Sequence, residues 1–265
     1  MRNWFRICWG ETVKQKQNYF NSPMTYVTSL VWPLLNCIMA YYTYSAFDIS
    51  RLVKYGISSK KELLIFIFTG LLVYNSFWLM IQSALYIQNE RENGTIEIVF
   101  LTPCSRLALV YGRALGSIIQ NIWMFICFCA VLLLVGSNSI HLIDLLLGYV
   151  ILLVSAVVWG GFINSIFLVS RDVDFWFNLC DCPMDLLSGT KIPIAAFPRW
   201  LGWASFVFPL TYCLIAIRDI FSSHRVQYMN LLYLGICLVV VIIITKVILC
   251  LAEKLNRKTG DLQLY

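Results

Sequence analysis

Long, nearly uninterrupted apolar segments constrain the fold of this chain more than any other feature. The clearest runs from about Leu231 to Ala252 and consists almost entirely of Val, Ile and Leu. A bilayer core of about 30 Å needs about 20 apolar residues in one helix, because a helix satisfies its own backbone polar groups in hydrocarbon. Of the 265 residues 60% are hydrophobic and only 13% are charged, whereas a soluble domain carries about 25% charged residues. The sequence therefore predicts an all-α membrane protein with several spans.

Six spans are expected, and together they make residues 1–265 a single transmembrane domain. The first five fall within residues 24–187, and a short tail at 253–265 follows the last. The fifth is shorter than the others, and the first contains a proline that is expected to kink it. The expected spans are about Met24–Ser45, Leu63–Tyr86, Leu107–Val135, Leu142–Ser170, Phe175–Leu187 and Leu231–Ala252.

The N-terminal segment, residues 1–22, mixes basic and aromatic side chains. This pattern predicts an amphipathic helix that lies in the headgroup layer of the membrane. Basic residues are somewhat more numerous on the side that would hold both termini, which favours a cytoplasmic location for the N- and C-termini. We therefore expect residues 1–22 to form a cytoplasmic interface helix.

The connection between the second and third spans, residues 90–103, holds the densest charge cluster of the chain. Charged side chains are costly in hydrocarbon, so this connection is expected to face water. Gly94 marks a turn, Thr95 is expected to N-cap a short helix at about 95–102, and Glu97 falls in its first turn, where the helix dipole favours an acid. Apolar residues recur at helical spacing up to Thr102-Pro103. Two interpretations remain open: a helix lying on the membrane, and a helix that docks a soluble partner.

Two blocks of residues closely resemble permease subunits of ABC-2 type transporters, which have the type V exporter fold. The blocks and the layout of the expected helices extend over nearly the whole chain. The first block is Glu90-Arg91-Glu92-x-Gly94-Thr95-Ile96-Glu97-x5-Pro103, and the second comprises Ser188-Gly189, Pro193, Phe197-Pro198-x-Trp200-Leu201, Pro209-Leu210-Thr211-Tyr212 and Arg218.

The resemblance implies a transport subunit of an ATP-driven exporter and not an enzyme in its own right. In that family the helix between the second and third spans is a coupling helix that meets a separate ABC ATPase. Two ATPase copies would hold ATP and Mg, and this chain would bind no cofactor itself. Two permease chains would form the pathway, with a homodimer favoured over a heterodimer. The residues implied in coupling are Glu90, Arg91, Glu92, Gly94, Thr95 and Glu97.

The expected location is a prokaryotic cytoplasmic membrane, with lipid around the spans. Family analogy favours an amphipathic substrate, namely a drug, a peptide antibiotic or a lipid. Permeases of the same family that export lipid-linked polysaccharide or sodium are the alternative. A stand-alone lipid-modifying membrane enzyme is the rival from another class, and it would leave the acidic helix as an ordinary loop.

Residues 188–230 are too apolar for an open loop, yet their three prolines exclude one straight span. A re-entrant pair of short helices that dips into the outer leaflet satisfies both observations. In the family such a hairpin narrows the outer mouth of the pathway. The residues expected at this outer gate are Pro193, Pro198, Trp200 and Pro209.

Asp181 and Asp185 lie four residues apart on the fifth expected span, where two ionised carboxylates on one helix face would repel each other. A buried acid must pair, face water or take a proton. They are candidates to line a pathway and to select a cationic or polar group of the substrate. The alternative, that they face water near the outer mouth and select nothing, stays open.

Several other kinds of chemistry lack a motif in this sequence. There is no Gly-x4-Gly-Lys-Ser/Thr phosphate loop, so ATP is not expected to bind by that route. The ten cysteines include no Cys-x-x-Cys pair, and no metal site is expected. The net charge of +6 is spread over helix ends, which fits anionic lipid, and no nucleic-acid partner is expected.

Overall fold

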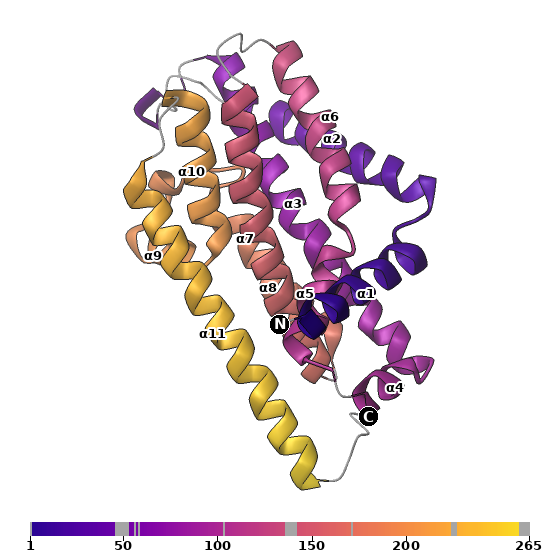
Figure 1. The fold of residues 1–265 in the computed structure, drawn as a ribbon. Coiled ribbons are helices and arrows are strands. Elements are labelled where there is room, and N and C mark those ends of the chain that lie inside the picture. Colours follow the sequence, from indigo (N-terminus) through magenta and orange to yellow (C-terminus); the bar gives the residue numbers. More distant parts are fainter. Residues whose placement is uncertain are drawn as a thin grey trace.

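A computed structural model describes residues 2–45, 53–55, 57, 59–102, 104–135, 142–170, 172–223 and 227–259. Within these ranges the regular structure is entirely helical, which confirms the predicted all-α class. The elements are α1 Arg2–Tyr19, α2 Pro23–Ser45, η2 Val53–Tyr55, α3 Lys60–Glu92, α4 Thr95–Leu101, α5 Arg106–Leu115, α6 Ile118–Val135, α7 Leu142–Val169, α8 Val173–Leu187, η3 Ile194–Ala196, α9 Arg199–Ser205, α10 Pro209–Ser223 and α11 Tyr228–Thr259. Figure 1 shows an elongated bundle, with α4 at one end and α1 lying across it near that end.

Within the described ranges, five segments are long and apolar enough to cross a membrane: α2, α3, α5 with α6, α7 and α11. A sixth candidate is the pair α9 and α10, which is bent by 90°. The fifth span was expected at Phe175–Leu187, but α8 has only 15 residues. At 1.5 Å per residue this helix is about 22 Å long, which is less than the bilayer core of about 30 Å. α8 alone is therefore too short for the predicted fifth span.

The third expected span is present as one candidate span, Arg106–Leu132, with an irregular turn inside it. α5 ends at Leu115 and α6 begins at Ile118, so the helix expected over Leu107–Val135 is interrupted at Gly116-Ser117, a residue pair that favours kinks. Here α1 comes very close: a Cβ added to Gly116 would lie 2.5 Å from the Cβ of Gln15. The irregular turn therefore lies where α1 packs against the bundle.

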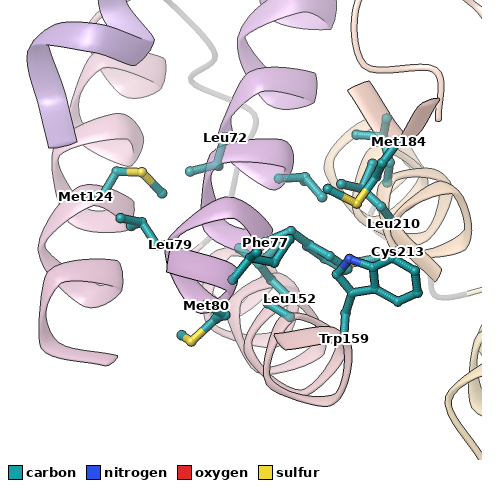
Figure 2. Close-up of a cluster of buried hydrophobic side chains, with 14 of the residues drawn as sticks. Leu72, Phe77, Leu79, Met80, Met124, Leu152, Trp159, Met184, Leu210 and Cys213 are labelled. Carbon is teal, nitrogen blue, oxygen red and sulfur yellow. The ribbon is translucent and has the colours of Figure 1, made fainter. Parts of the chain in front are cut away.

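α3 is the central helix of the bundle and contacts α2, α4, α5, α6, α7, α8 and α10. Figure 2 shows Phe77 and Met80 of α3 among side chains from the surrounding helices, with Trp159 of α7 and Met184 of α8 nearby. α7 approaches α3 closely at Gly160, where an added Cβ would lie 2.8 Å from the Met80 carbonyl oxygen. Because α3 extends to Glu92, the charged residues 90–92 end this helix and do not form a loop.

Arg218 on α10 holds the segment after α8 against the opposite end of α3. Its guanidinium donates hydrogen bonds to the carbonyl oxygens of Gly189 at 2.9 Å and Thr190 at 3.3 Å, and to that of Phe66 at 2.9 Å. The same group lies 3.6 Å from the centre of the Phe66 ring. A Cβ on Gly70 would lie 2.0 Å from the Thr190 carbonyl oxygen, so this contact is between backbones.

Candidate functional site

A sharp turn at Gly94 joins α3 to the short helix α4. Gly94 has φ +67, a left-handed conformation that glycine adopts without steric cost, and its N–H donates to the Arg91 carbonyl oxygen at 2.8 Å. Thr95 was expected to cap α4, and this prediction is wrong. Thr95 is already the first helical residue, and its hydroxyl donates to the Glu90 carbonyl oxygen at 3.1 Å. The threonine therefore links the start of α4 back to α3.

One apolar side of α4 faces the bundle, and a second apolar side faces outward. Ile96 is buried, whereas Ile98 on the other side is 64% exposed. Val99 is half-buried against the core. The side chain of Glu97 lies outside the described part of the structure, as does the residue Pro103. The observed helix Thr95–Leu101 thus agrees closely with the short amphipathic helix expected from the sequence.

Glu90 was implied in coupling, and the structure places its carboxylate inside the bundle. Its side chain is only 3% exposed and forms an ion pair with Arg113 of α5. Lys14 Nζ lies 3.1 Å from its carboxylate, and Gln15 Nε2 donates to it at 3.1 Å. The reason is that α3 continues past Glu90 and α1 covers this side of it. The carboxylate of Glu90 is therefore directed into the bundle.

Glu11 completes a network that we call the inner charge cluster: Glu11, Lys14 and Gln15 of α1, Glu90 of α3 and Arg113 of α5. The Glu11 carboxylate lies 3.2 Å from Arg113 Nε and 3.5 Å from Lys14 Nζ, and it accepts from Gln15 Nε2 at 3.0 Å. Arg113 is fully buried. Two acids face two bases, so the formal charges cancel. A buried base in such a network depends on its acids, since an unpaired buried charge is strongly destabilising.

Small residues allow α1 to lie directly on α5. Gly112 and Gly116 are four residues apart, a spacing that lets two helix backbones approach closely. A Cβ on Gly112 would lie 2.6 Å from the Cys8 carbonyl oxygen. The Thr12 hydroxyl donates to the Gly112 carbonyl oxygen at 3.0 Å. Backbone contact and the inner charge cluster thus fix α1 to α5 together.

The next two charged residues of α3 have different roles. Arg91 donates to the carbonyl oxygens of Phe167 at 2.7 Å and Leu168 at 2.9 Å, and also to that of Ser170. It therefore satisfies acceptors at the C-terminus of α7, where a helix favours a cation. Glu92 is exposed and accepts from Gln88 Nε2 at 3.2 Å. Among residues 90–92, Glu92 is the acid that reaches the surface.

Asp181 and Asp185 are separately paired. The Tyr74 hydroxyl of α3 donates to both carboxylate oxygens of Asp181, at 3.0 and 3.2 Å. Lys191 Nζ donates to Asp185 at 2.6 Å. The ion pair with Lys191 offsets the repulsion expected between two acids four residues apart. Both carboxylates are half-buried, and their predicted place on a pathway stays a prediction.

The prolines of the expected outer gate mark helix boundaries. Pro193 and Pro198 directly precede η3 and α9, and Pro209 is the first residue of α10. At such positions the missing N–H of proline would have no partner inside the helix. Trp200 is 73% exposed in the single chain. The bent pair α9–α10 agrees with the short helices expected in this region.

Sequence reasoning did not identify Glu11, Lys14, Gln15 and Arg113 as members of one cluster. One signal was present, because Arg113 lies within an apolar helical segment and an ionisable residue there needs a partner. The spacing of Glu11 and Gln15 places both on one face of α1. Their meeting with Glu90 depends on the packing of α1 across α5, which no local pattern specifies.

The described residues hold no group of three or more His, Cys, Asp or Glu side chains that could bind a metal. A family model described as ABC-2 type transporter matches residues 5–222. A search of curated proteins found no match. A search of solved structures found none either.

Proposed function

Since this chain belongs to the ABC-2 type transporter family, we propose that it exports an amphipathic substrate as the permease subunit of an ATP-driven transporter. Permeases of ABC systems are multi-pass membrane proteins that pair with ABC ATPase subunits, and ATP binds on the ATPase. The matched family is a transmembrane permease domain, distinct from the ATPase domain. The remaining question is how nucleotide-driven movement of a partner reaches the spans of this chain.

The observation that carries the proposal is the inner charge cluster beside the turn into α4. It joins three helices at the end of the bundle where α4 lies. A partner that pushes on α4 acts on α3 through Gly94 and the Thr95–Glu90 hydrogen bond. Because Glu90 is bonded to α1 and α5, these helices would move with α3. Arg91 would transmit the same movement to the end of α7.

The proposed contacts with the ATPase are the exposed acid Glu92 and the first-turn acid Glu97. Glu90 and Arg91 serve the same coupling from inside the permease, and Gly94 sets the angle of α4. This division follows from burial: a carboxylate that is 3% exposed cannot form an intermolecular ion pair without leaving its own partners.

The complete transporter would contain two copies of this chain and two ATPase subunits. We propose that Asp181 and Asp185 lie along the pathway and that the segment with Pro193, Pro198 and Trp200 narrows its outer mouth. The termini would lie in the cytoplasm of a prokaryotic cell, which puts α4 on the side where ATP is available. α1 would lie at the inner surface, where its exposed Phe5 and Trp9 suit the headgroup layer.

The test is a pull-down of the tagged chain, solubilised in mild detergent from its native membrane. We expect a stoichiometric soluble ATPase in the wild-type sample and its loss in the variant Glu92→Lys with Glu97→Lys. Glu62→Lys is the matched control, since Glu62 is an exposed acid in the first turn of α3, at the opposite end of that helix. Recovery of the chain without any ATPase would contradict the proposal. An ATPase retained by the double variant would contradict the docking role of α4.

A further inference from the structure

A cavity of about 390 Å³ lies between α2, α3 and α6. This volume is in the range of sites for drug-sized ligands, about 300–1,000 Å³. Trp32 and Trp78 form part of its wall. All lining side chains are uncharged. They are Thr28, Ser29, Trp32, Pro33, Asn75, Trp78, Leu79, Gln82, Gln120 and Met124.

Two of the lining residues carry a covered side-chain acceptor that lacks a partner within the described structure. Gln120 is 2% exposed, and its Nε2 donates to the Thr25 carbonyl oxygen at 3.1 Å, which leaves Oε1 without a hydrogen bond. The Oε1 atom of Gln82 is also buried without a hydrogen bond. Buried acceptors of this kind cost free energy when unsatisfied, so each such group in a folded protein needs an explanation.

Pro33 adds a third acceptor to the same wall. In an α-helix the N–H of each residue donates to the carbonyl four residues earlier, but proline has no N–H. The carbonyl of Ser29 therefore lacks its usual helical donor. Ser29 and Pro33 both line the cavity. The cavity thus combines aromatic walls with hydrogen-bond acceptors and has no charged group to balance a ligand charge.

We infer that this cavity binds an uncharged amphipathic molecule through hydroxyl or amide N–H groups, and that Gln82 and Gln120 turn their Oε1 atoms toward these donors. A carboxylate or phosphate would find no base among the lining residues, and a dication would find no acid. The apolar body of the ligand would lie against the two tryptophans. As a cargo site this inference rests on the proposed function and specifies the class of substrate.

The position of the cavity connects it to the inner charge cluster. Gln120 lies in the first turn of α6, directly after the irregular turn at Gly116-Ser117 where α1 packs. Its hydrogen bond to Thr25 joins α6 to the first turn of α2. Movement of α1 and α5 would therefore change the distance between α2 and α6, and with it the shape of the cavity.

The experiment measures equilibrium binding of three tritiated probes to the chain in nanodiscs, without ATPase and with partition into empty nanodiscs subtracted. The probes share a naphthylhexyl body and carry a primary amide, a dimethyl amide or a carboxylate. We expect the primary amide to bind about tenfold tighter than the dimethyl amide, because only the primary amide donates hydrogen bonds. The carboxylate should bind weakest.

Variants locate the binding. Gln82→Met removes an acceptor at similar volume and should reduce the preference for the primary amide to about threefold or less. Ser29→Leu fills the cavity and should abolish binding of all probes. Gln88→Met is the control, because Gln88 is an exposed residue of α3 that does not line the cavity. Each variant is first checked by size-exclusion chromatography.

Equal affinity for the three probes, or wild-type binding by Ser29→Leu, would overturn the site. Because no ATPase is present, this result is independent of the pull-down, and either proposal can fail alone. The cargo role has its own test: the primary amide should stimulate ATP hydrolysis of the reconstituted complex. Binding to the cavity without stimulation would refute that role.

Discussion

Replacing Glu90 by glutamine tests whether the inner charge cluster holds α1 on the bundle. The substitution keeps the size of the side chain but leaves fully buried Arg113 with one acid among the described residues, Glu11 at 3.2 Å. Breaking a buried ion pair costs about 3–5 kcal/mol, and the remaining acid puts the expected loss near the lower value. About 3 kcal/mol corresponds to about a hundredfold increase in the equilibrium constant for release of α1.

Hydrogen exchange of the α1 amides, measured by mass spectrometry in nanodiscs, reports this release directly. Glu92→Gln is the control, two residues along the same helix but exposed, and it should change exchange less than about fivefold. Adding Lys14→Gln to Glu90→Gln makes the net charge of the inner charge cluster zero again. The double variant should recover about tenfold of the lost protection of the α1 amides against exchange. Equal exchange in Glu90→Gln and Glu92→Gln would refute the reasoning.

Four further predictions concern the same end of the bundle. Gly112→Ala should displace α1, since its Cβ would lie 2.6 Å from the Cys8 carbonyl oxygen, whereas Gly10→Ala has no atom within 4 Å; a lower melting temperature for Gly112→Ala alone is the expected result. Gly94→Asn should keep coupled ATP hydrolysis and Gly94→Val should lose it. Asn tolerates a φ of +67, whereas this conformation costs about 1–2 kcal/mol for most other residues. Equal ATP hydrolysis by the two variants would contradict this reasoning. Arg91→Lys keeps the charge but loses the planar fork, so exchange should increase over residues 166–170; unchanged exchange there would show that α7 does not need this cap. Burial raises the pKa of the Cys8 thiol above its ordinary value, so its thiolate forms only at higher pH. Maleimide labelling of Cys8 at pH 8 should therefore be slower than labelling of exposed Cys182. The labelling rate of Cys8 should rise with pH and be faster in Glu90→Gln, and a pH-independent rate would count against burial.

The helical class and the short helix after Gly94 could be predicted because each depends on local signals. Apolar length predicts spans, and the positive φ of Gly94 needs the one residue type that adopts it freely. The burial of Glu90 could not be predicted in this way. A charged run beside an apolar segment looks the same whether α3 ends at Tyr86 or continues to Glu92, and only the arrival of α1 makes Glu90 internal.

Residues 188–230 show the same limit of prediction from local signals. Its prolines correctly indicated several short helices. The length of α8 was also apparent in the sequence, but the 90° angle between α9 and α10 is visible only in the structure. Likewise, Tyr74 and Lys191 explain how two acids are accommodated on α8, and both come from other segments. Side chains from different helices that meet only through packing cannot be predicted from the spacing of residues along one helix.

We expect α3 to pivot at its close contact with α7, where Gly160 meets Met80. The helix has 33 residues and is bonded near one end through Glu90 and near the other through the Phe66 carbonyl. At 1.5 Å per residue Glu90 lies about 15 Å from Met80 and Phe66 lies about 21 Å away on the other side. Spin labels near the two ends should therefore move in opposite directions when nucleotide binds, and parallel movement would exclude a pivot. The two distances from Met80, about 15 and 21 Å, set the ratio of the displacements at the two ends. A displacement of about 3 Å at Glu90 would become one of about 4 Å in the opposite direction beside Thr190, so α3 would reverse and enlarge the movement.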